Sequence, residues 1–395
     1  MGRVRAIVVF LLAVSLAPIC FFSSGRAAGG GGSGPKLRIV GTPRMVFDWS
    51  RTACSEAEEP DLPARAVRSA DGQVHLYLSH YESYRMSGPG LNRLHPVCRP
   101  IMTSPQDPNP SHFRDRRWIA SPFTFDGRHV WALVHHEYQG SRHPGRCPEK
   151  AYYPCWYNAI TLARSSDGGR TFRQARSPRD LVAASAHRYR HGIGPVGVFA
   201  PSNLVRRGQY LYALVRVREP GQASGDCLIR TDEIPAAGSW RAWDGKAFAV
   251  ALRDPYRRRS APRLRCQRVA PDEISEMTES LTFSKVLDRY LLLGIAGPRT
   301  NPPGREKGIY FSLSEDLIHW SPRRLLLPAT TLHTFACGDR PPIAYPSVID
   351  PASASRSFET TGRRPFLYFT KFRYRNCRKT SNRDLMRVRI SIGRE

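Results

Sequence analysis

The chain has 395 residues, and its 60 lysines and arginines against 33 aspartates and glutamates give a formal net charge of +27 at pH 7. The charge is spread along the chain and is almost entirely arginine, which differs from the concentrated basic patch or tail of a specific nucleic-acid binder. We therefore expect no specific nucleic-acid partner. A field of this sign would still attract anionic glycans or cell-envelope polymers.

The N-terminus has the layout of a secretory signal peptide. Arg3 and Arg5 precede an apolar run over residues 6–22, and small residues follow, so cleavage is expected after Ala27. The run is short for a membrane span, although an uncleaved anchor is the alternative. Residues 28–54 are expected to be a flexible Gly-rich segment. No later segment has the length and apolarity of a span, which predicts a secreted or periplasmic protein.

Eight of the nine cysteines lie beyond the signal segment, an even number that suits disulfides in an exported protein. Spacing alone does not determine the connectivity. We expect neighbours along the chain to pair, as Cys54–Cys98, Cys147–Cys155, Cys227–Cys266 and Cys337–Cys377. No pair has the Cys-x-x-Cys spacing of a zinc site, so we predict no metal, and no cofactor motif is present.

Five segments share one pattern, in which a small-residue motif opens a strand, a tight turn follows, and a second strand is rich in aromatic and aliphatic residues. They cover residues 64–81, 120–138, 200–219, 279–297 and 345–372. A second hairpin follows in at least three of them, within residues 158–172, 227–240 and 308–320. Four antiparallel strands per unit, repeated around an axis, form a β-propeller blade. We predict an all-β, five-bladed β-propeller over residues 55–395, with an irregular β-sandwich as the alternative.

Two turn motifs carry a family resemblance. Ser165-x-Asp167-x-Gly169-x-Thr171-Phe172 resembles the Asp-box turn of sialidases and other propellers, and residues 314–320 (SEDLIHW) resemble a turn of five-bladed glycosidases and glycoside phosphorylases. The resemblance implies a glycosidase-like protein of a secreted bacterial group. It also implies three acids, namely a base or nucleophile in blade one, a helper in blade two and an acid in blade three. Asp61 stands near the first place, but residues 118–121 and 199–203 contain no carboxylate, so the triad cannot be transferred whole.

Blade geometry predicts where a site would lie, because the start of each innermost strand and the end of the second strand meet at one rim. We assign Asp61 as base or nucleophile, Glu279 as acid and Glu137 as the rival acid, with Met277 and Leu281 raising the pKa of the acid. Other residues at these strand ends are expected to bind substrate: Arg65, His80, Trp118, His135, Asn203, Arg216, Glu276, Tyr345 and Arg373.

These candidates favour an exported glycoside hydrolase that is a monomer and has no cofactor. We expect its substrate to be a carbohydrate, and the arginines are compatible with an anionic one. Hydrolysis needs two carboxyl groups about 5–5.5 Å apart for retention or about 6.5–9.5 Å apart for inversion. The alternative is a non-catalytic secreted propeller that binds glycans or anionic envelope polymers, and a third, based on charge alone, is an electrostatic binder of nucleic acid or lipopolysaccharide. In structural terms, Asp61 could belong to a solvated acidic loop, and Glu276 and Glu279 could simply pair with arginines.

Overall fold

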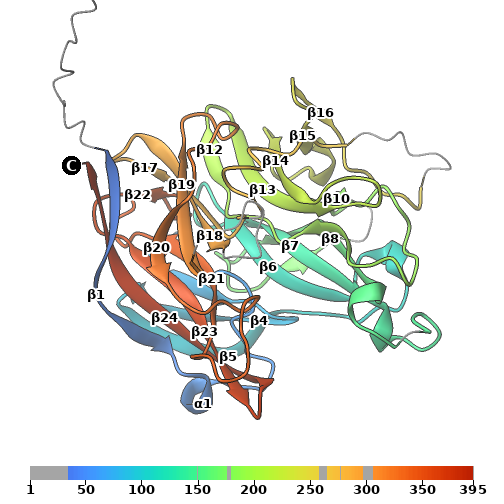
Figure 1. Ribbon diagram of the computed structural model, residues 1–395, viewed down its shortest axis with the longest axis horizontal. Coiled ribbons are helices and arrows are strands. Elements are labelled where there is room, and N and C mark those ends of the chain that lie inside the picture. The colour runs from blue at the N-terminus through green and yellow to red at the C-terminus, as the bar shows by residue number, and fades with distance from the viewer. Residues whose placement is uncertain are drawn as a thin grey trace, which may run out of the picture.

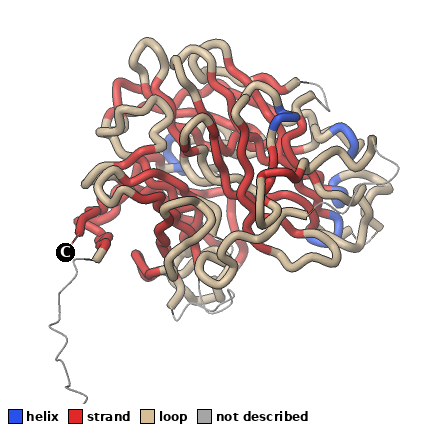
Figure 2. The backbone as a smooth tube through the Cα atoms, turned by 90° about the horizontal axis from the view of Figure 1, so that it is seen from above, coloured by secondary structure: helices blue, strands red, loops and turns tan. Residues whose placement is uncertain are grey.

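The computed structural model describes residues 34–148, 150–175, 179–257, 265–275, 277–296 and 306–394. In this part of the chain, strands dominate, and helix is confined to the four-residue α1 (Trp49–Thr52) and a few short 3-10 turns (Figures 1 and 2). The predicted all-β class is therefore confirmed. None of the described helices is long and apolar enough to cross a membrane. The expected signal peptide and Glu276 lie outside the described residues.

The first repeat forms a four-stranded antiparallel sheet. Its strands follow one another in chain order as β2 (Arg65–Arg68), β3 (Val74–Leu78), β4 (Glu82–Gly90) and β5 (Arg93–Thr103). The turn between β2 and β3 contains Gly72 at φ +84°, a conformation that glycine adopts without steric cost.

The second and third repeats share one sheet. The second contributes β6 (Arg116–Phe123), β7 (Val130–Gln139) and β8 (Trp156–Ser165), and β8 also pairs with β9 (Arg173–Gln174) and β10 (Leu181–Ala184). The third contributes β12 (Val205–Arg207), β13 (Tyr210–Arg218), β14 (Gly225–Thr231), β15 (Arg241–Trp243) and β16 (Phe248–Val250). Strand β11 (Val196–Phe199) joins them, because it runs parallel to β8 and antiparallel to β13.

The fourth repeat forms a sheet in the order β20 (Arg324–Pro328), β19 (Gly308–Ser314), β18 (Arg289–Ala296), β17 (Ser280–Ser284) and β22 (Thr360–Thr361). The last sheet contains β21 (Ile343–Ile349), β23 (Phe366–Arg375), β24 (Arg378–Arg394) and β1 (Pro35–Phe47). All five predicted hairpins are therefore present, as β2–β3, β6–β7, β12–β13, β17–β18 and β21–β23.

The prediction of a flexible segment up to residue 54 is wrong for residues 35–47. These residues form β1, which pairs antiparallel with β24 near the other end of the chain (Figure 1). The physical reason is alternation: Leu37 and Ile39 pack against the hydrophobic core of the last two repeats, while Arg38 between them is exposed. The backbone groups of β24 thereby gain a hydrogen-bonded neighbour on their outer edge.

Polar side chains link each repeat to the next. Three serines donate to backbone carbonyls of a neighbouring repeat, a fourth accepts a backbone N–H, and one asparagine both donates and accepts. The contacts are Ser79 to Ile119, Ser121 to Ser202, Asn203 to Leu281, Ser280 to Val348, and Ser347 to Ala64. Ser121, Asn203, Ser280 and Ser347 lie where their repeats open, whereas Ser79 follows the second strand of the first repeat. Together these side chains connect consecutive units, and the last contact returns from the fifth repeat to the first.

The turn at residues 165–172 joins β8 to β9. The Asp167 carboxylate accepts the backbone N–H groups of Arg170 (2.9 Å) and Thr171 (3.0 Å) and the Thr171 hydroxyl (2.6 Å). Phe172 is buried and packs edge-on against Tyr77 of the first repeat at 5.7 Å between ring centroids. The motif therefore holds a tight turn and fastens the second repeat to the first.

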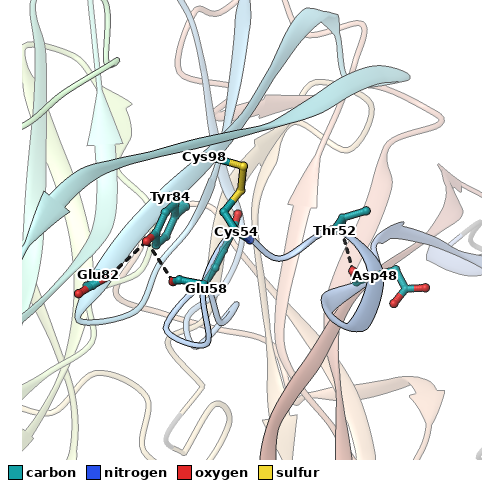
Figure 3. The surroundings of a disulfide bond; sticks show 8 residues. Asp48, Thr52, Cys54, Glu58, Glu82, Tyr84 and Cys98 are labelled. Carbon is teal, nitrogen blue, oxygen red and sulfur yellow. Dashed lines mark hydrogen bonds between the residues drawn. A yellow bond between two sulfur atoms is a disulfide. The ribbon is translucent and has the colours of Figure 1, made fainter.

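The expected cysteine pairing is confirmed for all eight cysteines beyond the signal segment. Figure 3 shows one of these bonds, in which Cys98 on β5 is joined to Cys54, and the carboxyl group of Glu58 lies beside Cys54. Four disulfides are typical of proteins from an oxidising compartment outside the cytoplasm.

Candidate active site

A cavity of about 1130 Å³ opens where strand ends from successive repeats meet. Seven of the predicted site residues line it, including the three carboxyl groups assigned to chemistry. They are Asp61, His80, Trp118, Glu137, Arg216, Glu279 and Tyr345. The first repeat supplies Asp61, the second supplies Glu137 and the fourth supplies Glu279, so acids from three separate repeats face one space.

Asp61 lies in the loop before β2, with its side chain 19% exposed. Its Oδ1 accepts hydrogen bonds from the Tyr345 hydroxyl (3.1 Å) and from the Arg383 guanidinium, and Nε2 of His80 lies 3.7 Å from Oδ2. Burial opposes its ionisation, but the surrounding positive charges and the tyrosine hydrogen bond outweigh this and lower the pKa of Asp61. The carboxyl group is therefore an anion at neutral pH, held by specific partners and not part of a solvated loop.

Glu137 lies near the end of β7 and is held by hydrogen bonds from several directions. Its Oε2 accepts from the Gln139 amide (2.6 Å) and the Tyr152 hydroxyl (3.2 Å), and its Oε1 lies 3.0 Å from Nε2 of His135. These partners orient both oxygen atoms. The rotation of the carboxylate is therefore restricted before any ligand arrives.

Glu279 immediately precedes β17 and has the opposite character from Asp61. Within the described residues, its oxygens accept long backbone N–H bonds from Ile295 (3.3 Å) and Thr278 (3.2 Å). Burial raises the pKa of Glu279, and the positive charge of Arg216 together with the backbone N–H groups offsets this only in part. Gly294 makes room for this arrangement, because a Cβ at that position would lie 2.5 Å from Glu279 Oε2 and 2.6 Å from the Met277 side chain. Met277 is thus the apolar neighbour that the sequence predicted.

Aromatic side chains connect the surroundings of Asp61 and Glu137. The charges of both carboxylates help to raise the pKa of Tyr345 and of Tyr152, after the larger effect of burial on each hydroxyl. The Trp118 ring lies 5.8 Å from the His80 ring and 5.6 Å from the His135 ring. The two acids therefore belong to one continuous polar and aromatic neighbourhood.

Four other predicted site residues do not line the cavity. Arg65 and Asn203 are buried and bonded to neighbouring repeats, Asn203 through the backbone N–H and carbonyl of Leu281. His135 lies behind Glu137, and Arg373 is bonded to the carboxylate of Asp384 on β24 (2.7 Å). Arg65 is the first residue of β2, and its side chain extends toward the neighbouring repeats. The backbone carbonyls of Ala120 and Glu279 accept its hydrogen bonds there.

Several residues of the cavity could not be recognised from the sequence because they lie in loops or far along the chain. Arg383, on β24, forms ion pairs with Glu59 (2.6 Å) and Asp61. Tyr152 lies in the loop that the Cys147–Cys155 disulfide closes. The aromatic composition of this loop is the sequence feature that could have indicated its place at the cavity. Among the described residues, no three His, Cys, Asp or Glu side chains are grouped so that they could hold a metal ion.

No family model matches this sequence, and a comparison with curated proteins finds no relative. Solved structures do match. A family 117 glycoside hydrolase produced by the marine bacterium Zobellia galactanivorans has 9% identity and a TM-score of 0.52, over 91% of this chain and 90% of that one. This chain has the same propeller-like fold.

Two further solved structures are similar at lower scores. A glycosyl hydrolase from Bacteroides ovatus has 8% identity and a TM-score of 0.48, over 91% of this chain and 93% of that one. The sucrose-6-phosphate hydrolase from Lactobacillus gasseri has 10% identity and a TM-score of 0.46, over 86% of this chain. This chain spans only 62% of the length of that hydrolase.

Proposed function

We propose that this protein is an exported glycoside hydrolase whose reaction takes place among Asp61, Glu137 and Glu279. The observation that supports this most strongly is that carboxyl groups from three repeats face one cavity while their environments drive two of their pKa values apart. The pKa of Asp61 is lowered and that of Glu279 is raised. A carboxyl group that ionises readily and a second one that holds its proton more tightly are the pair that glycoside cleavage requires.

In this proposal Glu279 is the general acid, which donates its proton to the leaving-group oxygen as the glycosidic bond breaks. Asp61 attacks the anomeric carbon directly or activates a water molecule to do so. Glu137, oriented by Gln139 and Tyr152, stabilises the positive charge that develops on the sugar ring. Glu137 thereby takes the role of the helper acid that the family resemblance implies in the second blade. It lies on β7, the second strand of that repeat, and not on the innermost strand.

The finer fold assignment belongs to the same proposal. We propose that the five repeats are five propeller blades, and the side-chain contacts that run from each repeat to the next and back to the first support this arrangement. The four disulfides support export. A secreted or periplasmic location would bring the cavity to polysaccharides outside the cytoplasm.

The test is hydrolysis of a panel of aryl glycosides and oligosaccharides by the protein and by two variants. Glu279→Gln should lower kcat by about 10²- to 10⁴-fold for sugar leaving groups, and by less for activated aryl groups that need no proton. Asp61→Asn should lower kcat for every substrate. NMR of the first product formed decides whether Asp61 acts as nucleophile or as base.

Glu315→Gln is the matched control, because Glu315 is 69% exposed and pairs with Arg289 away from the cavity lining. It should leave kcat unchanged. If the unmodified protein binds glycans in this panel but cleaves none, the hydrolase proposal is wrong and a non-catalytic glycan-binding propeller is the better description.

A further inference from the structure

One wall of the cavity carries side chains that the proposed reaction does not use. The aromatic members are Tyr153, Trp156 and Phe199. The Trp156 ring meets the Phe199 ring edge-on at 5.4 Å, and the Tyr153 ring lies 6.0 Å from Trp156, with Tyr153 64% exposed. Exposed aromatic faces of this kind suit stacking against the apolar face of a sugar ring.

Arginines continue this wall along the third repeat. Arg216 and Arg218 lie two residues apart on β13 and so share one face, while Val215 and Val217 are buried on the other. Arg216 acts electrostatically on Glu279, and Arg218 lies farther out, where it is exposed. The wall therefore begins beside the proposed acid and runs toward the solvent.

Arg268 completes the group from the segment after the third repeat. It forms a β-bridge with Cys227 on β14, and its side chain crosses Gly225, where a Cβ would lie 2.5 Å from its Cδ. The absence of a side chain at Gly225 thus lets the Arg268 chain lie against the strand. Arg216, Arg218 and Arg268 all line the cavity.

The ion pairing differs between the two sides of the cavity. Near Asp61, Arg383 is matched by Glu59 and by Asp61 itself. Within the described segments, by contrast, no acidic side chain forms an ion pair with Arg218 or Arg268. The lining as a whole has seven lysines and arginines against five acids. Arg218 and Arg268 therefore keep their positive charge available to a ligand on the wall beside Glu279.

We propose that this wall is a leaving-group subsite for a sugar that carries a carboxylate or a sulfate group. The inference rests on the proposed function, because a general acid at Glu279 places the leaving group on its own side of the cavity. Arg218 and Arg268 bind the anionic group through the planar fork of each guanidinium, which matches the oxygens of both ligand types. The aromatic side chains hold the ring of the same sugar.

The test measures binding separately from hydrolysis. Isothermal titration of oligogalacturonides, sulfated galactan oligosaccharides and neutral galacto-oligosaccharides is compared for the unmodified protein, Arg218→Ala and Arg268→Ala. Each variant should bind one anionic probe about five- to tenfold more weakly and the neutral probe equally well, since one charge-assisted contact is lost. The probe that responds identifies the group as carboxylate or sulfate.

Arg206→Ala on β12 is the control, since Arg206 is exposed, does not line the cavity, and its loss changes the net charge equally. If Arg206→Ala weakens binding as much as Arg218→Ala does, the effect is a general field and the subsite is refuted. For an aryl glycoside with a neutral leaving group, Arg218→Ala should leave kcat/KM unchanged, and a tenfold loss would overturn the leaving-group placement. Anion-selective binding without any hydrolysis would remove the proposed reaction but leave the arginine site.

Discussion

Replacing Arg65 with alanine tests whether one buried cation holds the repeats together beneath the cavity. The Arg65 side chain, on a residue only 4% exposed, donates to the Ala120 carbonyl (3.1 Å), the Ser347 hydroxyl (2.9 Å) and the Glu279 carbonyl. These acceptors belong to the second, fifth and fourth repeats. Burial lowers the pKa of Arg65 to about 9, so the guanidinium stays protonated at pH 7.

The magnitude follows from the acceptors that Arg65→Ala would leave unpaired. The Ser347 hydroxyl still donates to the Ala64 carbonyl (2.6 Å), so two carbonyls, those of Ala120 and Glu279, lose their side-chain donor. Each buried polar group left without a partner costs about 1–3 kcal/mol. The free energy of unfolding should therefore fall by about 2–6 kcal/mol.

Urea unfolding without reductant, followed by tryptophan fluorescence, measures this change. Arg68→Ala is the matched control, because Arg68 lies on the same strand and is only partly buried, with hydrogen bonds to the carbonyls of Ser353 (3.2 Å) and Ser355 (3.5 Å). It should cost about 1 kcal/mol or less. If Arg65→Ala costs no more than Arg68→Ala, water from the cavity replaces the guanidinium and the reasoning is refuted.

Two further changes probe the surroundings of the site. The carboxyl group of Glu58 is fully buried, and burial raises its pKa to about 7, which the hydrogen bond from the Cys54 N–H offsets only in part. The folded state then holds this proton more tightly than the unfolded chain, so stability should fall by up to about 3 kcal/mol as the pH rises from about 4.5 to about 7. Glu58→Gln should remove that loss in urea unfolding at pH 5 and pH 8, and an unchanged pH dependence would contradict the assignment. Replacing both Cys147 and Cys155 with serine should lower the free energy of unfolding by about 2–3 kcal/mol. It should also raise KM in steady-state assays, because Tyr152 lies within the loop that they close; an unchanged KM would separate the loop from substrate binding.

Local features of the fold could be read from the sequence because they depend on residues close together in the chain. Hairpins follow from alternating apolar residues and from turn residues such as Gly72, whose φ is positive. The cysteine pairs join residues of the same or adjacent repeats. Strand periodicity also placed Asp61, Glu137 and Glu279 at one rim, since antiparallel strands within a repeat return to the same edge.

Other features were decided only by tertiary contacts between distant parts of the chain. Strand β1 pairs with β24, which lies near the opposite end of the sequence. Arg383 donates a hydrogen bond to Asp61, which is 322 residues away in the chain. Periodicity states which face of a strand is buried, but it does not state which distant group will satisfy a buried charge. For that reason the sequence predicts Arg65 at the cavity, whereas in the structure its side chain donates hydrogen bonds to backbone carbonyls of other repeats. The opposite pKa shifts of Asp61 and Glu279 likewise arise from burial and from partners that only the folded chain brings together.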